Sequence, residues 1–157
     1  MTVSIDYIVS SLPSLAFGAP APVSWERFCE SCGGKELILR SLDERGWHDL
    51  ETQLRNAMAE ARGGAQDVRP AVGASLYWKN RVGACFQEKD VARREEQLDK
   101  VWWDAAGELT DVTAPLGIGA LATYAVRLGI ALKRAKISTE AGNAAFDRLT
   151  SGTKVTF

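Results

Sequence analysis

The sequence predicts an all-α, mainly helical protein: a compact multi-helix domain with a short extended N-terminal segment and a buried C-terminal helical hairpin. Apolar residues recur at helical spacing along much of the chain, as at Leu50, Leu54 and Ala57, and this period is typical of amphipathic helices. The stretch from Leu116 to Leu132 carries Arg127 as its only charge. A helix this apolar belongs in the centre of a helical domain.

Length and composition favour one domain. The chain has 157 residues, 46% of them hydrophobic, which is enough to build a core. With 19 basic and 20 acidic residues its formal charge is -1, so we expect no nucleic-acid partner, because phosphate contacts need a basic patch. We expect a single helical domain over 1–157, divisible into sub-units 1–62 and 76–150 joined by a loop at 63–75.

The N-terminal half contains one extended segment and three helices. Residues 3–9 alternate apolar and polar, except at Ile8, and this pattern predicts the extended segment. The proline- and glycine-rich passage that follows should run over the surface. Ser24 is a good N-cap for a helix over 24–32. Two more helices are predicted over 35–45 and 47–62, with Gly46 between them.

The C-terminal half should be entirely helical. Helices are predicted over 76–86 and 90–109, the second supported by the i,i+4 pairs Asp90–Arg94 and Glu96–Lys100. The apolar helix over 116–132 should then turn back into a second helix that opens near Ser138. The small and anchoring residues of this second helix are Gly142, Ala144, Ala145, Phe146 and Leu149.

The cysteines leave two interpretations open. Cys29 and Cys32 form a CxxC pair, and with Cys85 and the single histidine, His48, they make four potential metal ligands. The alternative function is therefore a free-standing cytosolic helical protein with a small-ligand or metal site near these four residues. All three cysteines also fall on apolar helical stripes, where they would pack as small hydrophobes. We expect the latter: buried, reduced cysteines and neither metal nor cofactor.

Adjacent aromatic residues suggest a partner surface. Trp102 and Trp103 point about 100° apart on a helix, so if Trp102 faces the core with Leu98, Trp103 points elsewhere. Trp103 then either packs in a second layer or anchors a partner, and interfaces favour tryptophan. The same argument applies to Tyr77 beside Trp78. The partner-binding candidates are Trp103 and Tyr77.

Targeting and membrane signals are weak. The N-terminus carries Asp6 and no basic n-region, unlike a signal peptide. The apolar run over 116–132 is shorter than the roughly 20 residues that span a bilayer. We therefore expect no direct membrane span and a cytoplasmic protein.

Both ends of the chain resemble proteins associated with rotary ATPases. The segment from Tyr7 to Leu15, YIVSSLPSL, resembles the opening of a bacterial family of uncharacterised proteins encoded in V-type ATPase gene clusters, which begins with a tyrosine-rich strand and a Leu-Pro-x-Leu turn. Towards the C-terminus a spaced set of residues is similar to the helical repeats of the shaft-receiving subunit of V/A-type ATPases. The set is Arg94, Leu98, Asp99, Trp103, Tyr124, Leu128, Arg134, Gly142 and Phe146.

The resemblance implies a non-catalytic role. The shaft-receiving subunit is an all-helical funnel that sits on the membrane ring and receives the foot of the central shaft. There are two departures from the pattern of that subunit. Ala135 stands where the subunit usually has an aromatic residue, directly after the arginine that Arg134 matches, and the chain has only about half the length of the subunit. The implied function is a coupling or assembly subunit that contacts the shaft or ring through helix surfaces, is peripheral to the membrane through that complex, and is not an enzyme.

Replacing Leu128 with Asp should strongly destabilise the fold, because an uncompensated charge in the core helix costs several kcal/mol. Thermal unfolding followed by circular dichroism measures this loss. An unchanged melting temperature would contradict the placement of this helix in the core.

Overall fold

The protein is all-α, as predicted. The computed structural model describes residues 4–64, 68 and 75–155, and for residues 138–155 it describes the backbone alone. These residues contain seven α-helices, one 3-10 turn and no strand. Among them, no helix combines the length and the apolarity that crossing a bilayer requires.

The helix boundaries follow local capping signals. Ser24 accepts a hydrogen bond from the Arg27 amide, and Asp90 accepts from the amides of Ala92 and Arg93. Gly46 separates two helices. Its φ of 75° lies in the left-handed region, which favours glycine. The elements are α1 (Ile5–Ser11), α2 (Trp25–Ser31), α3 (Lys35–Glu44), α4 (Trp47–Ala61), α5 (Leu76–Cys85), α6 (Val91–Ala106), η2 (Gly107–Leu109) and α7 (Ile118–Val155).

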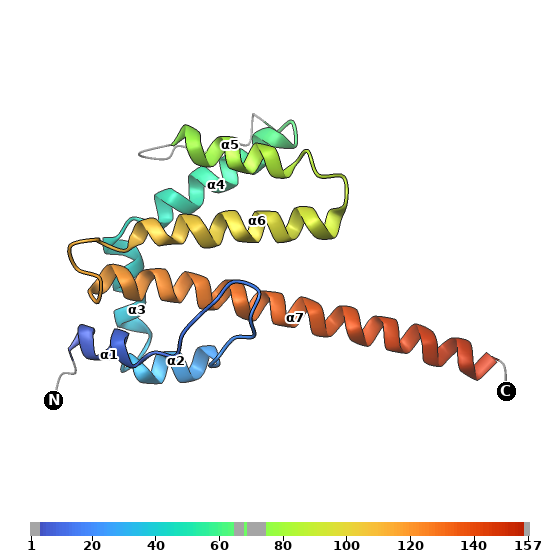
Figure 1. Ribbon diagram of the computed structural model, residues 1–157, viewed down its shortest axis with the longest axis horizontal. Helices are drawn as coiled ribbons and strands as arrows, with labels where there is room; N and C mark the ends of the chain where they lie inside the picture. Colours follow the sequence, from blue (N-terminus) through green and yellow to red (C-terminus); the bar gives the residue numbers. More distant parts are fainter. Residues whose placement is uncertain (1–3, 65–67, 69–74, 156–157) are drawn as a thin grey trace.

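The helices are arranged in layers on the two sides of the antiparallel pair α6 and α7 (Figure 1). Helices α4 and α5 pack together and cover α6, whereas α1, α2 and α3 contact α7. The C-terminal half of α7 continues beyond the other helices (Figure 1). At about 1.5 Å per residue, the 38 residues of α7 span roughly 57 Å.

Two apolar clusters form the core and meet at α7. The first joins α4, α5 and α6 around Leu54 and Val82, and Ala122 of α7 belongs to it. The second joins α1, α2 and α3 around Phe28, and Leu121 and Leu128 of α7 belong to it. One side of the apolar stretch 116–132 therefore packs into the first cluster and another side packs into the second. This burial on two sides explains why the stretch carries almost no charge.

The predicted extended N-terminal segment is wrong, because Ile5–Ser11 is the helix α1. The exception in the alternating pattern, Ile8, is the informative residue. Ile8 is 4% exposed, and Val9 and Leu12 pack beside it in the second cluster. These three residues share a helical face, and no strand in the described residues is present to pair with an extended segment.

The predicted C-terminal hairpin is also wrong, because α7 runs without a turn from Ile118 to Val155. Residues 133–137, Lys-Arg-Ala-Lys-Ile, contain neither glycine nor proline and include strong helix formers, so nothing local ends the helix. The expected packing roles of Gly142, Ala144, Ala145, Phe146 and Leu149 lie outside the described side chains. Most of the expected loop, residues 65–67 and 69–74, likewise lies outside the described residues.

The start of α7 crosses η2 and the turn after it with backbone against backbone. A Cβ built on Gly119 would collide with the carbonyl oxygen of Leu109 and lie 3.1 Å from the Asp111 amide nitrogen. The same region has side-chain caps on backbone carbonyls: Arg127 Nε donates to Trp103 O at 3.0 Å, and Thr123 Oγ1 donates to Ala106 O at 2.8 Å. Arg45 Nε donates to Leu109 O at 2.6 Å. These bonds satisfy carbonyls that the end of a helix leaves unpaired.

Replacing Gly119 with Ala should lower stability by about 1–3 kcal/mol, because backbone atoms must move to admit the methyl group. Gly129 is the matched control in the same helix, since a Cβ there meets nothing within 4 Å. Gly129→Ala should be neutral or stabilising. Equal melting temperatures for the two variants would show that the crossing is not a tight contact.

Candidate functional site

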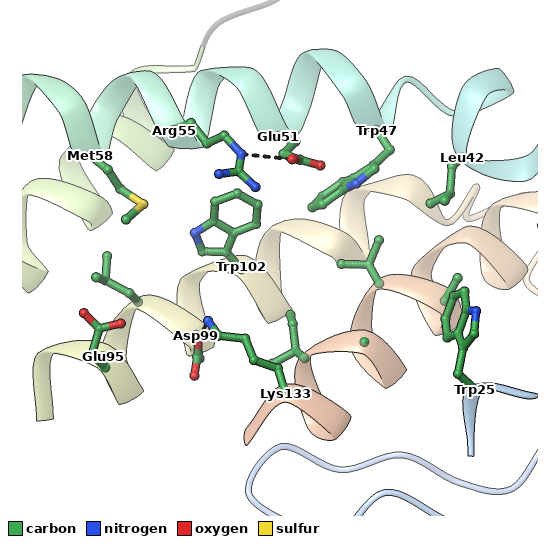
Figure 2. A pocket seen from close by; sticks show the side chains of 15 residues that line it. Trp25, Leu42, Trp47, Glu51, Arg55, Met58, Glu95, Asp99, Trp102 and Lys133 are labelled. Atoms are coloured by element: carbon green, nitrogen blue, oxygen red, sulfur yellow. Dashed lines mark hydrogen bonds and ion pairs between the residues drawn. The ribbon is translucent and has the colours of Figure 1, made fainter. Parts of the chain in front are cut away.

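A groove with a volume of about 530 Å³ lies between α4 on one side and α6 and α7 on the other (Figure 2). Leu98, Ala125 and Val126 contribute apolar surface to it. We call this feature the tryptophan groove. Its remaining lining residues are Trp25, Leu42, Trp47, Glu51, Arg55, Met58, Glu95, Asp99, Trp102, Gly129, Ile130 and Lys133.

Two partly buried tryptophans from different helices meet in the groove. Trp47 begins α4, and Trp102 lies in the C-terminal half of α6. Their ring centroids lie 5.8 Å apart at an interplanar angle of 68°, an edge-to-face arrangement that aromatic pairs prefer. Arg55 lies over the Trp102 ring with its Cζ 5.5 Å from the centroid, and its Nε donates to Glu51 at 2.9 Å (Figure 2).

The charged residues of the groove are mostly paired with one another. Asp99 accepts from Lys133 at 3.3 Å and from Arg134 at 3.2 Å. Glu51 accepts from Arg55. Glu95 is exposed and has no ion-pair partner among the side chains that the structure describes. The groove therefore has an apolar interior, with one unpaired carboxylate among its lining residues.

Of the adjacent tryptophans, Trp102 packs against the first cluster with Leu98, as expected, and Trp103 lies on another side of α6. Trp103 is only 6% exposed. Phe17 from the N-terminal loop packs edge-on against it at 5.5 Å, and Arg127 stacks on it at 5.3 Å. Trp103 thus belongs to a second packing layer, one of the two alternatives that the sequence left open, and Trp102 is the less deeply buried of the two rings. Contact between Trp103 and a partner stays a prediction, with little accessible surface to support it.

Tyr77, the second predicted contact, does reach the surface. It is 59% exposed at the start of α5, beside Leu76, which is 69% exposed. Its ring packs edge-on against buried Trp78 at 4.8 Å. The Trp78 indole donates to Glu108 at 2.9 Å, which fixes the orientation of the pair. Tyr77 does not line the tryptophan groove, so the two aromatic surfaces are separate.

The four candidate metal ligands do not converge. Cys29 and Cys32 are buried in the second cluster, Cys85 is buried in the first, and His48 is exposed on α4. In the described part of the chain, no three His, Cys, Asp or Glu side chains are grouped as a metal ion would need. Burial, together with the neighbouring Cys29, raises the pKa of the Cys32 thiol to about 11. The helical stripes thus place the cysteines in apolar packing positions, as expected.

A partly buried ion-pair network lies next to Trp103 on α6. Asp104 accepts from Arg81 at 2.8 Å and pairs with Lys100 at 3.1 Å. Partial burial alone would raise the pKa of Asp104, but the hydrogen bonds from Arg81 and Lys100 outweigh it and lower the pKa. This carboxylate therefore stays ionised and shared between two cations.

Sequence reasoning places Trp102 in the core and Trp47 on a helical stripe, and both do pack against the first cluster, but it does not predict that they also line a groove. The sequence does contain a signal of this groove. Glu51 and Arg55 follow Trp47 at i+4 and i+8, so they place polar groups on the same face of the helix as the tryptophan. An apolar groove with aromatic walls is suited to bind apolar side chains of another molecule. No family model, curated protein or solved structure matches this chain.

Because the thiolate is the reactive form, the raised pKa and the burial of Cys32 predict slow alkylation by iodoacetamide at pH 8 in the native protein. Cys29 and Cys85 should also react slowly, because both are buried. All three should react rapidly in guanidinium chloride, which serves as the control. Rapid native labelling, followed by mass spectrometry, would contradict this prediction.

Proposed function

We propose that this protein is a non-catalytic assembly or coupling subunit that receives an amphipathic helix of a partner in its tryptophan groove. The single observation that carries the proposal is the meeting of partly buried Trp47 and Trp102 in a groove with an apolar lining. Tryptophan is enriched among the residues that contribute most to binding. Helix-in-groove recognition uses apolar anchors at i, i+3 or i+4 and i+7, and an apolar groove between helices suits that pattern.

The charges of the groove favour a partner helix with a basic residue near its anchors. Arg55 and Lys133 are already paired with Glu51 and Asp99. Glu95 is the carboxylate left for a partner within the described side chains. A rim charge of this kind contributes mainly to the association rate and to specificity, whereas the aromatic anchors supply affinity. Binding should therefore weaken only modestly as salt rises.

The partner we propose is a component of a V/A-type rotary ATPase, from the central shaft or the membrane ring. This part of the proposal is supported by the resemblance at Tyr7–Leu15 and along α6 and α7, and by the helical architecture. One difference from the family pattern is that α1 replaces the strand of the family opening. The groove offers one docking site rather than a complete socket for the shaft.

Gly129→Arg tests the groove without touching the core. Gly129 is an exposed groove residue whose Cβ would meet nothing within 4 Å, so an arginine there should obstruct docking and leave the fold intact. Gly83→Arg is the matched control, because Gly83 is also helical and unobstructed but lies outside the groove. Trp102→Ala should weaken binding by about 2 kcal/mol, roughly thirtyfold in Kd.

The measurement is co-purification with shaft and ring components at low ionic strength, followed by Kd determination for each variant. Failure of the wild-type protein to associate with any of these components would overturn the ATPase proposal. Association that survives Gly129→Arg as well as it survives Gly83→Arg would overturn the groove as the docking site. Tyr77→Ala tests the second exposed aromatic surface independently, since Tyr77 lies outside the groove.

A further inference from the structure

Arg127 is a half-buried cation without an ion-pair partner among the described side chains. Its Nε donates to the Trp103 carbonyl at 3.0 Å, and its guanidinium stacks on the Trp103 ring. No carboxylate in the described part of the chain lies within ion-pair distance of it. Asp104 lies close enough to act electrostatically, but it is already shared by Arg81 and Lys100. Charges this deep are ordinarily paired.

Arg127 lines a cavity of about 290 Å³ on a different face of α7 from the tryptophan groove, and the two share no lining residue. The cavity lies between the N-terminal loop, the start of α7 and the turn after η2. Leu12, Leu15 and Ala120 contribute apolar surface to it. Its size is at the lower end of ligand pockets, which suits a molecule of only a few heavy atoms.

Most polar groups around this cavity are already committed. Thr123 Oγ1 donates to Ala106 O at 2.8 Å, so the 2.7 Å contact between Thr110 and Thr123 uses the Thr110 hydroxyl hydrogen. The Tyr124 hydroxyl donates to Pro13 O at 2.8 Å. Among the described residues, the side-chain donors left uncommitted are the two Nη groups of Arg127 and the hydroxyl of exposed Ser14.

The Nη groups are also not fully enclosed by protein. Every buried side-chain nitrogen and oxygen in the described residues has a hydrogen-bond partner. Because the Nη atoms of Arg127 have no partner there, neither of them is fully buried. The stacked Trp103 ring and the Nε bond hold the guanidinium plane in place, so its fork is preorganised at little further entropic cost.

We propose that this cavity binds a small monocarboxylate with a short apolar tail. A guanidinium fork matches a planar carboxylate in a bidentate arrangement, and one cation balances one negative charge. A phosphate dianion would need more positive charge than the described lining supplies. The tail would lie against Leu12, Leu15 and Ala120, and the Ser14 hydroxyl could donate to the second carboxylate oxygen.

The test is a titration of the ¹⁵N-labelled full-length protein with sodium butyrate, followed by ¹H–¹⁵N NMR at the Arg127 Nε–Hε group and the amides of Ser14 and Leu15. Butyrate should give saturable shifts. Butyramide, which has the same shape without the charge, and sodium chloride at equal ionic strength should not. Equal responses to butyrate and butyramide, or to butyrate and chloride, would overturn the proposal, as would saturable binding of inorganic phosphate but not of butyrate.

Two variants assign the binding to this cavity. Arg127→Gln should weaken butyrate binding at least tenfold. Arg45→Gln is its matched control, because Arg45 caps the neighbouring Leu109 carbonyl but does not line the cavity. If Arg127→Gln disturbs the fold, Ser14→Phe provides a second test, since it fills the cavity from an exposed position and leaves the Arg127 cap intact. Unchanged butyrate affinity in a folded Arg127→Gln or in Ser14→Phe would contradict the site.

Discussion

The close crossing of α7 over η2 and the turn after it, at Gly119, is where three helices are joined. Because the two backbones touch there, the carbonyls at the end of α6 and η2 lie within reach of side chains from other helices. Arg127 and Thr123 of α7 and Arg45 at the end of α3 each donate to one of these carbonyls. Three helices are thereby fixed to one another by polar bonds, and the two apolar clusters are held on opposite sides of α7.

The same crossing decides which tryptophan of α6 is buried. Arg127 can cap the Trp103 carbonyl only if that side of α6 faces α7, and the N-terminal loop then covers the Trp103 ring with Phe17. The next residue back along the helix, Trp102, is turned towards α4 and meets Trp47. The exposed aromatic surface is thus a consequence of the packing that buries its neighbour.

Helix α7 separates two concave surfaces of different chemical character. The face with Val126, Gly129 and Ile130 lines an apolar groove whose charges are mostly paired. The face with Thr123, Tyr124 and Arg127 lines a smaller cavity that contains a cation unpaired among the described side chains. One helix can serve both because successive residues point about 100° apart. Macromolecular docking and small-anion binding can therefore be tested with substitutions on one helix that do not overlap.

The sequence by itself determined the all-α class and most helix boundaries, because periodicity, caps such as Ser24 and Asp90, and the break at Gly46 act within a few residues. Only the tertiary structure decided the rest. A helical wheel fixes the angle between Trp102 and Trp103 but not which side another helix covers, and it places three cysteines on apolar stripes without saying that the stripes enter different clusters. Because Ile8 breaks the alternating pattern of residues 3–9, the local sequence did not decide between a strand and a helix. Burial of Ile8 in the cluster shared with α7 selected the helix. Burial of a surface depends on segments far away in the chain, so local patterns set the elements and long-range packing chose their faces.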